Sequence, residues 1–163
     1  VAAGPAFEGG NLRCGVGGVP GAISHVVFDG ALRCATIGGA PARGICGSGV
    51  LDAAAVLLRT GVIDETGRLA DADDLENEAL AARLTGSGGE RMFLLEENTA
   101  DGQPVVLTQK DVRELQLAKA AVAAGIRVLL ADTKRTHADV AALFWHFLDA
   151  LWIFLMALFW GWG

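Results

Sequence analysis

Basic residues are scarce in this chain. Its 163 residues include 13 lysines and arginines against 19 aspartates and glutamates, which gives a formal net charge of −6. A protein that binds nucleic acid needs a basic stripe or patch to neutralise phosphates, and no such stripe is present. The composition therefore excludes a nucleic-acid surface, and nucleic acid is not expected among the partners.

Cysteine is also rare. The three residues Cys14, Cys34 and Cys46 are an odd number, and none belongs to a C-x-x-C motif or lies beside a pair of histidines. This pattern excludes a disulfide framework and a cysteine-based zinc site. It is typical of reduced thiols that serve as small buried residues.

The chain has no initiator methionine at Val1 and no charged-then-apolar leader, so we expect a fragment or a processed product. Its length predicts about one domain, with room for an appendage. The charge distribution suggests where that division lies. Residues 1–139 carry nearly every charge and predict a soluble domain, which the reduced thiols place in the cytoplasm. Residues 140–163 contain one acidic residue and one histidine.

The segment 140–163 is rich in phenylalanine and tryptophan. Roughly 20 apolar residues suffice to span a bilayer, and tryptophan is typical of the membrane–water interface. The segment therefore predicts a transmembrane helix, with membrane anchoring as the consequence. The alternative is a buried C-terminal core helix.

The most informative soluble stretch is residues 44–49, Gly-Ile-Cys-Gly-Ser-Gly, which precedes a run of good helix formers. It predicts a tight loop that enters a helix, with Ser48 as the N-cap and Gly61 as the C-cap that ends the helix. Backbone N–H groups at such a helix start bind anions, so Gly47, Ser48 and Gly49 are candidate phosphate contacts. No Lys-Ser or Lys-Thr follows, so this is not a P-loop. The alternative is close helix packing that only glycine permits.

Two hairpins are predicted. Residues 22–28 and 31–37 flank an Asp-Gly turn, and residues 91–95 and 105–107 flank a second one. Between the hairpins, residues 64–78 are acidic and poor in apolar side chains, so we expect a surface excursion without chemistry.

Thr108 and Asp111 have the spacing of a capping box, which predicts a helix from about Gln109 to Leu130. One face of it is apolar, and Lys119 falls in the same stripe. Its amine either extends to solvent, joins a structural ion pair or contacts an anionic ligand. The residues of the apolar stripe are Val112, Leu115, Val122, Ile126 and Leu129.

Glu8 lies in the glycine-flanked loop 4–11, Gly-Pro-Ala-Phe-Glu-Gly-Gly-Asn. A carboxylate held in such a loop can act as a base or hold a magnesium-bound water. The alternative is a solvated turn glutamate. His25 is a lone histidine in a predicted strand, a position more typical of a packed or surface residue than of a ligand.

Several of these motifs occur in the order found in one family. Residues 4–9, 20–23, 44–49, 108–113 and 118–121 resemble the C-terminal ATPase domain of ferredoxin-type reductive activators of corrinoid proteins. The resemblance covers about residues 1–140. It implies an α/β fold, namely a partial actin/sugar-kinase/Hsp70-like ATPase domain of short hairpins and helices, followed here by a hydrophobic C-terminal helix.

The resemblance also implies a function. ATP and Mg would be the cofactors, a corrinoid protein the partner, and a homodimer the usual assembly; a 2Fe-2S cluster would lie only in an N-terminal domain upstream of Val1. Glu8 would be the catalytic residue, and Gly47, Ser48, Gly49 and Lys119 would bind the nucleotide. No resident metal site is expected within this chain.

The chain departs from the family after Val140, where a strand and a glycine-rich adenosine-binding turn should follow. Instead, residues 144–154 resemble the start of the last transmembrane helix of subunit III of haem–copper oxidases. His146 and Asp149 would be packing or hydrogen-bonding residues there. Two alternatives to an activator fragment follow: a membrane-anchored structural segment of a respiratory oxidase, or a non-functional fused reading frame.

Overall fold

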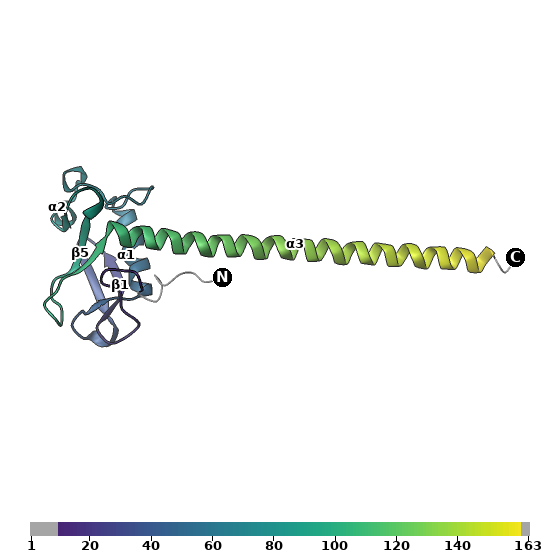
Figure 1. Ribbon diagram of the computed structural model, residues 1–163, viewed down its shortest axis with the longest axis horizontal. Helices are drawn as coiled ribbons and strands as arrows, with labels where there is room; N and C mark the ends of the chain where they lie inside the picture. Colours follow the sequence, from purple (N-terminus) through teal and green to yellow (C-terminus); the bar gives the residue numbers. More distant parts are fainter. Residues whose placement is uncertain (1–9, 161–163) are drawn as a thin grey trace. The chain divides into compact units, whose positions relative to one another are not determined.

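The computed structural model describes the backbone of residues 10–160, and the side chains of these residues except 132–135, 137–138, 141 and 152–160. The chain divides into two compact units, Val1–Val122 and Ala123–Gly163. The first unit holds the strands described between residues 10 and 160 and the two shorter α-helices, α1 and α2 (Figure 1). The predicted division into 1–139 and 140–163 stays a prediction.

The first sheet contains β1 (Ala22–Phe28), β2 (Leu32–Thr36) and β3 (Gly44–Ile45) in the order β2-β1-β3. β1 and β2 are antiparallel, with Val26 opposite Cys34, so the predicted hairpin is confirmed. β3 runs parallel to β1. It was not predicted, because two residues within a glycine-rich stretch carry no strand periodicity.

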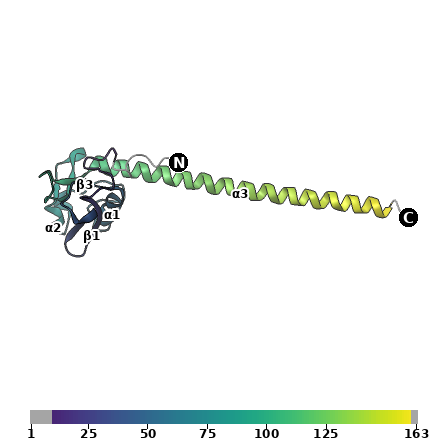
Figure 2. The same ribbon diagram turned by 90° about the horizontal axis from the view of Figure 1, so that it is seen from below.

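Helix α1 (Gly47–Arg59) follows β3 directly and packs on β1, as Figure 2 shows. Its buried face contains Val50, Ala53, Val56 and Leu57, at helical spacing. The helix ends at the C-cap Thr60, and Gly61 follows with φ of +75°. This left-handed conformation is the one that glycine adopts without cost, which confirms the predicted helix stop.

The second sheet contains β4 (Leu84–Thr85), β5 (Met92–Glu96) and β6 (Val105–Thr108), all antiparallel and in that order. The hairpin of β5 and β6 confirms the prediction, whereas β4 was not predicted. Short helices complete this part of the chain: η2 (Ile37–Gly39), η3 (Ala72–Asp74), α2 (Glu78–Ala81) and η4 (Gly88–Glu90).

One hydrophobic core joins both sheets, α1 and the first turns of the last helix, α3. Phe93 on β5 is fully buried and lies opposite Leu107 on β6. Ile23 on β1 and Leu57 on α1 are buried as completely. The two sheets therefore share one core.

The acidic stretch 64–78 is mostly exposed, as predicted, but it is also anchored. Leu69 is fully buried, and Asp71 accepts hydrogen bonds from Arg68 and from Arg91, whose Nε lies 2.8 Å from Oδ1. The hydrogen bond from Arg91 is the main cause that lowers the pKa of Asp71 below its ordinary value. The charges therefore fix this stretch to Arg91, immediately before β5, in addition to solvating it.

Helix α3 runs from Gln109 to Trp160. The predicted capping box is confirmed, because the Asp111 N–H donates to Thr108 Oγ1 over 3.1 Å and the Thr108 N–H donates to Asp111 Oδ2 over 2.8 Å. The predicted end at Leu130 is wrong. No glycine or proline occurs in residues 131–139 to stop the helix, so the C-terminal helix is a continuation of α3.

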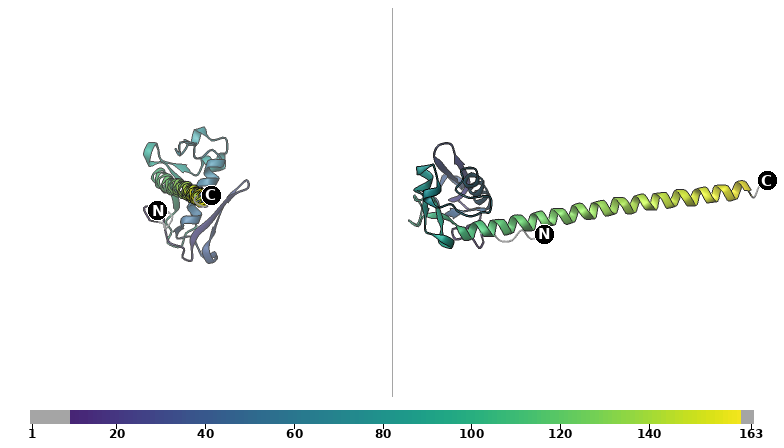
Figure 3. Two further views of the ribbon diagram at one scale, coloured as in Figure 1. Left: turned by 90° about the vertical axis from the view of Figure 1, so that its right-hand side faces the viewer. Right: turned by 90° about the horizontal axis from the view of Figure 1, so that it is seen from above.

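The predicted apolar stripe of α3 is buried only near its start. Val112 is 4% exposed and Leu115 is partly buried, but Val122 is 38% exposed and Ile126 52%. Within the first unit, the first turns of the helix lie beside the strands, as the right panel of Figure 3 shows, and Val112 and Ala118 belong to the core. The prediction of a core-facing stripe as far as Leu129 is therefore wrong beyond the first turns.

Within the described part of the chain, no helix is both long enough and apolar enough to cross a membrane. The transmembrane helix predicted for 140–163 is thus not supported. The backbone of 161–163 and the side chains of 152–160 lie outside the described residues.

Candidate functional site

The predicted phosphate contacts lie in the first turn of α1. The N-cap is Cys46, which has extended backbone angles, so the prediction that Ser48 caps the helix is wrong. Gly47 already belongs to the helix and Ser48 is its second residue. The Ser48 hydroxyl instead donates to the carbonyl oxygen of Ser24 on β1 over 3.1 Å, which ties the helix start to the sheet.

Gly49 is buried against β1. A Cβ atom added there would lie 2.8 Å from the carbonyl carbon of Ile23 and closer still to its oxygen. Side chains do not approach a backbone so closely, and the backbone cannot swing aside. Close packing, the alternative that the sequence left open, is therefore sufficient to explain this glycine.

The sulfur of Cys46 lies at the same helix start. Cys46 is 6% exposed, and its thiol contacts the carbonyl oxygen of Ile23 at 3.4 Å and Ser48 Oγ at 3.3 Å. Burial acts to raise the pKa of this thiol, but the hydrogen bond with Ser48 and the neighbouring N–H groups of Gly49 and Ser48 together lower it. The start of α1 thus favours negative charge.

His25 is a surface residue on β1, as the sequence favoured. Its side chain is 66% exposed, and its Nδ1 contacts the carboxylate of Asp52 on α1. Asp52 also accepts a 3.4 Å hydrogen bond from the N–H of Val26. Among the residues described, no group of three or more His, Cys, Asp and Glu side chains could hold a metal ion.

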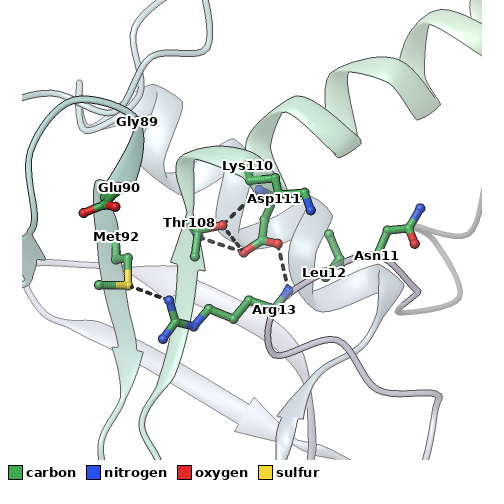
Figure 4. Close-up of a pocket in the computed structure, with 9 residues that line it drawn as sticks. All are labelled: Asn11, Leu12, Arg13, Gly89, Glu90, Met92, Thr108, Lys110 and Asp111. Atoms are coloured by element: carbon green, nitrogen blue, oxygen red, sulfur yellow. Dashed lines mark hydrogen bonds between the residues drawn. The ribbon is translucent and has the colours of Figure 1, made fainter.

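A cavity of about 740 Å³ lies elsewhere in the first unit, between the loop 11–13, the end of η4 with the start of β5, and the start of α3 (Figure 4). Its size falls in the range of small-molecule sites. The residues that line it are Asn11, Leu12, Arg13, Gly89, Glu90, Met92, Thr108, Lys110 and Asp111.

The predicted site residues that the structure describes do not line this cavity. Gly47, Ser48 and Gly49 lie at the start of α1, and Lys119 is exposed on α3 instead of belonging to a buried stripe. Glu8 lies outside the described residues. The sequence missed the cavity because the loop 11–13 lies about 80 to 100 residues along the chain from the other two segments that line it. The capping box at Thr108 was the only local signal.

Asp111 holds two walls of the cavity together. It is 2% exposed, and its Oδ1 accepts a 2.8 Å hydrogen bond from the N–H of Arg13. Its Oδ2 accepts hydrogen bonds from the N–H and the hydroxyl of Thr108, both at 2.8 Å. The loop 11–13 is therefore fixed to the first turn of α3.

Cys34 on β2 is expected to be an unreactive thiol. Its Sγ–H points to the carbonyl oxygen of Leu95, 3.6 Å away. Burial, with a further contribution from Glu96 and opposed by Arg83, raises the pKa of Cys34 to about 11. At pH 8 only about one molecule in 1,000 carries the thiolate, so iodoacetamide should modify Cys34 slowly in the folded protein and rapidly in urea.

The raised pKa of Cys34 also predicts the direction in which the stability of the fold changes with pH. Because folding raises the pKa of Cys34, the favourable contribution of the protonated thiol is complete below the unfolded pKa and is lost as the pH rises towards 11. Alkylation followed by mass spectrometry between pH 7 and 11 measures this directly. Equal rates for Cys34 in the native and the urea-unfolded chain at pH 8 would contradict it.

Comparison with solved structures defines the class of fold. The chain superimposes on a solved structure described as a reductive activator for corrinoid, iron–sulfur protein, with a TM-score of 0.71 and 33% sequence identity. The match covers 80% of this chain and 21% of that one. The fold is therefore an α/β fold of the actin/sugar-kinase/Hsp70 type, as the resemblance implied.

The family follows from the sequence. The model of the family described as the C-terminal domain of RACo, the ASKHA domain, matches residues 1–145, so the chain belongs to this family. A curated relative, the corrinoid activation enzyme RamQ of Eubacterium limosum, is 37% identical over 133 residues. That match covers 79% of this chain and 22% of the relative, so the chain spans about a fifth of the length of both relatives.

Proposed function

We propose that this chain is part of the ATPase domain of an ATP-dependent reductive activator of corrinoid proteins. The observation that carries the proposal is the family match over residues 1–145. In the complete protein, an iron–sulfur cluster in an N-terminal domain passes an electron to a cobalt corrinoid, and ATP hydrolysis drives this uphill step. The corrinoid protein is the partner, and the activator acts in the cytoplasm as a homodimer.

The proposed nucleotide contacts are those of the sequence motifs. Glu8 serves as the catalytic carboxylate or holds the water of a bound magnesium ion, and Gly47 to Gly49 face the phosphates of Mg·ATP. The lowered pKa of Cys46 supports a helix start that favours negative charge. Lys119 is exposed and can therefore reach an anionic ligand.

Two further hypotheses concern the tail. The likeness of residues 144–154 to an oxidase subunit suggests a membrane-anchored structural segment, and the junction after Val140 is also compatible with a fused reading frame. We retain these hypotheses because three aromatic side chains of the tail are exposed, namely Phe144, Trp145 and Phe147. Co-purification with haem would favour the first of them.

The isolated 163-residue chain is expected to bind Mg·ATP weakly and not to hydrolyse it. The reason is that the chain spans about a fifth of its relatives' length, and other segments are needed to complete a nucleotide cleft. Limited proteolysis tests the function: millimolar Mg·ATP should slow cleavage within residues 10–122, and Mg with inorganic phosphate should not. Steady release of phosphate from ATP would contradict the expected inactivity, and an unchanged cleavage pattern would contradict nucleotide binding.

A further inference from the structure

One face of α3 follows a seven-residue repeat. Written as a heptad, the sequence places valine or isoleucine at position a and leucine at position d in alternate heptads. β-branched side chains at a with leucine at d are typical of parallel, two-stranded coiled coils. The a residues are Val112, Ile126 and Val140, and the d residues are Leu115, Leu129 and Leu143.

The intervening heptads vary this pattern. Their a positions hold Lys119 and Thr133, and their d positions hold Val122 and Thr136. Phe147 occupies the a position that follows Val140. From Val122 to Phe147, therefore, no charged residue falls at a or d, and a contact along this face would bury no charge there.

The side chains of this face lie outside the hydrophobic core that the structure describes. The exposed fraction is 52% for Ile126, 60% for Val140, 71% for Leu143 and 64% for Phe147. The helix from Val122 to Phe147 is about 38 Å long. Helices in proteins gain most of their stability by packing an apolar face, and exposed apolar patches mark interaction sites. This face is therefore a surface for a partner.

The charges beside the face are complementary to those of a second copy of the helix. By position on the helix, Asp132 and Asp139 fall on one flank, and Arg127 and Lys134 fall on the opposite flank. In a parallel pair related by a two-fold axis, each flank of one helix faces the opposite flank of the other, so acidic residues face basic residues. In an antiparallel pair, equal flanks would meet and their charges would repel.

We propose that residues 122–147 of α3 pair with the same residues of a second copy of this chain in a parallel, two-stranded coiled coil. The heptad residues and the flanking charges both favour a second copy as the partner. The proposal goes beyond the proposed function and does not depend on it. The homodimer proposed for the activator follows from the family resemblance, whereas this contact is argued from the helix alone.

The assembly arm of the test is sedimentation velocity of the 163-residue chain, which should be a dimer at micromolar concentrations. V140D should raise the dimer dissociation constant about 100-fold or more, because it would bury two carboxylates face to face without partners. V128D is the matched control. It makes the same exchange in the same helix at position c, away from the face, where Val128 is 68% exposed, and it should dimerise like the parent chain.

The orientation arm compares L143C with V128C under oxidised glutathione. In a parallel pair in register, the d positions of the two copies lie opposite each other, so L143C should form an intermolecular disulfide between its two new thiols. V128C should not, because position c points away from the partner helix. Mass spectrometry of the cross-linked peptides separates this bond from bonds of the native cysteines.

The outcomes separate this proposal from the proposed function. A monomeric parent chain would overturn the coiled coil, including one that bound phosphatidylcholine vesicles through this face. A V140D chain that dimerised like the parent would also overturn it, while leaving the homodimer of the activator intact. Equal cross-linking of L143C and V128C would overturn the parallel arrangement. Dimerisation that needs Val140, in a chain that Mg·ATP does not protect from proteolysis, would support the coiled coil and overturn the nucleotide.

Discussion

Replacement of Gly49 by alanine should dislodge α1 from β1 and destabilise the first unit by at least about 3 kcal/mol. The new methyl group would lie 2.8 Å from the carbonyl carbon of Ile23, and this neighbour is a strand backbone that cannot rotate away. The helix must therefore shift as a whole, and Val50 and Ala53 would lose their packing. Thermal unfolding monitored by circular dichroism should show a midpoint lower by more than about 12 °C.

Gly17→Ala is the matched control. A Cβ atom at Gly17 would meet nothing within 4 Å, and its φ lies outside the left-handed region. The substitution should change stability by less than about 0.5 kcal/mol, or raise it slightly because alanine restricts the unfolded chain. Equal midpoints for the two variants would show that the Gly49 contact does not limit α1 packing.

Phe93→Ala should cost about 3–5 kcal/mol of unfolding free energy. Phe93 is fully buried in the central strand of the second sheet, opposite Leu84 on one side and Leu107 on the other. Its removal leaves a cavity in the core shared by both sheets, and the surrounding strands can collapse into it only partly. Urea unfolding should show a lower midpoint with little change in the slope.

Two controls define the origin of that loss. Phe93→Leu retains most of the buried volume and should cost about 1–2 kcal/mol. Phe147→Ala removes the same atoms from a side chain that is 64% exposed, and it should be close to neutral. If Phe93→Ala were as mild as Phe147→Ala, the core of the second sheet would be more plastic than its packing indicates.

The parts of the fold that the sequence predicted are those with local signals. Both hairpins depend on an Asp-Gly pair between apolar runs, and Gly30 and Gly102 indeed adopt positive φ. The helix start at Thr108 and the helix stop at Gly61 are set by residues within one turn. The order of the motifs across residues 1–140 predicted the family, and no single motif would have been specific enough to do so.

The parts that the sequence did not predict depend on tertiary contacts. β3 and β4 have two residues each and exist because neighbouring strands provide partners. Ser48 was predicted as the N-cap, but its hydroxyl donates to the carbonyl oxygen of Ser24 on β1. The cavity forms where the loop 11–13 contacts α3. A contact between two distant segments cannot be predicted from the sequence pattern of either segment alone.

The hydrogen bond between the N–H of Arg13 and Asp111 spans 98 positions of the chain. During synthesis at about 5–20 residues per second, the segment around Arg13 therefore waits about 5–20 s before its acceptor has been made. The hairpin of β1 and β2 needs only near neighbours and can form within microseconds once both strands are available. The hairpin of β1 and β2 can therefore form before Asp111 has been made, whereas the loop 11–13 can dock on α3 only afterwards.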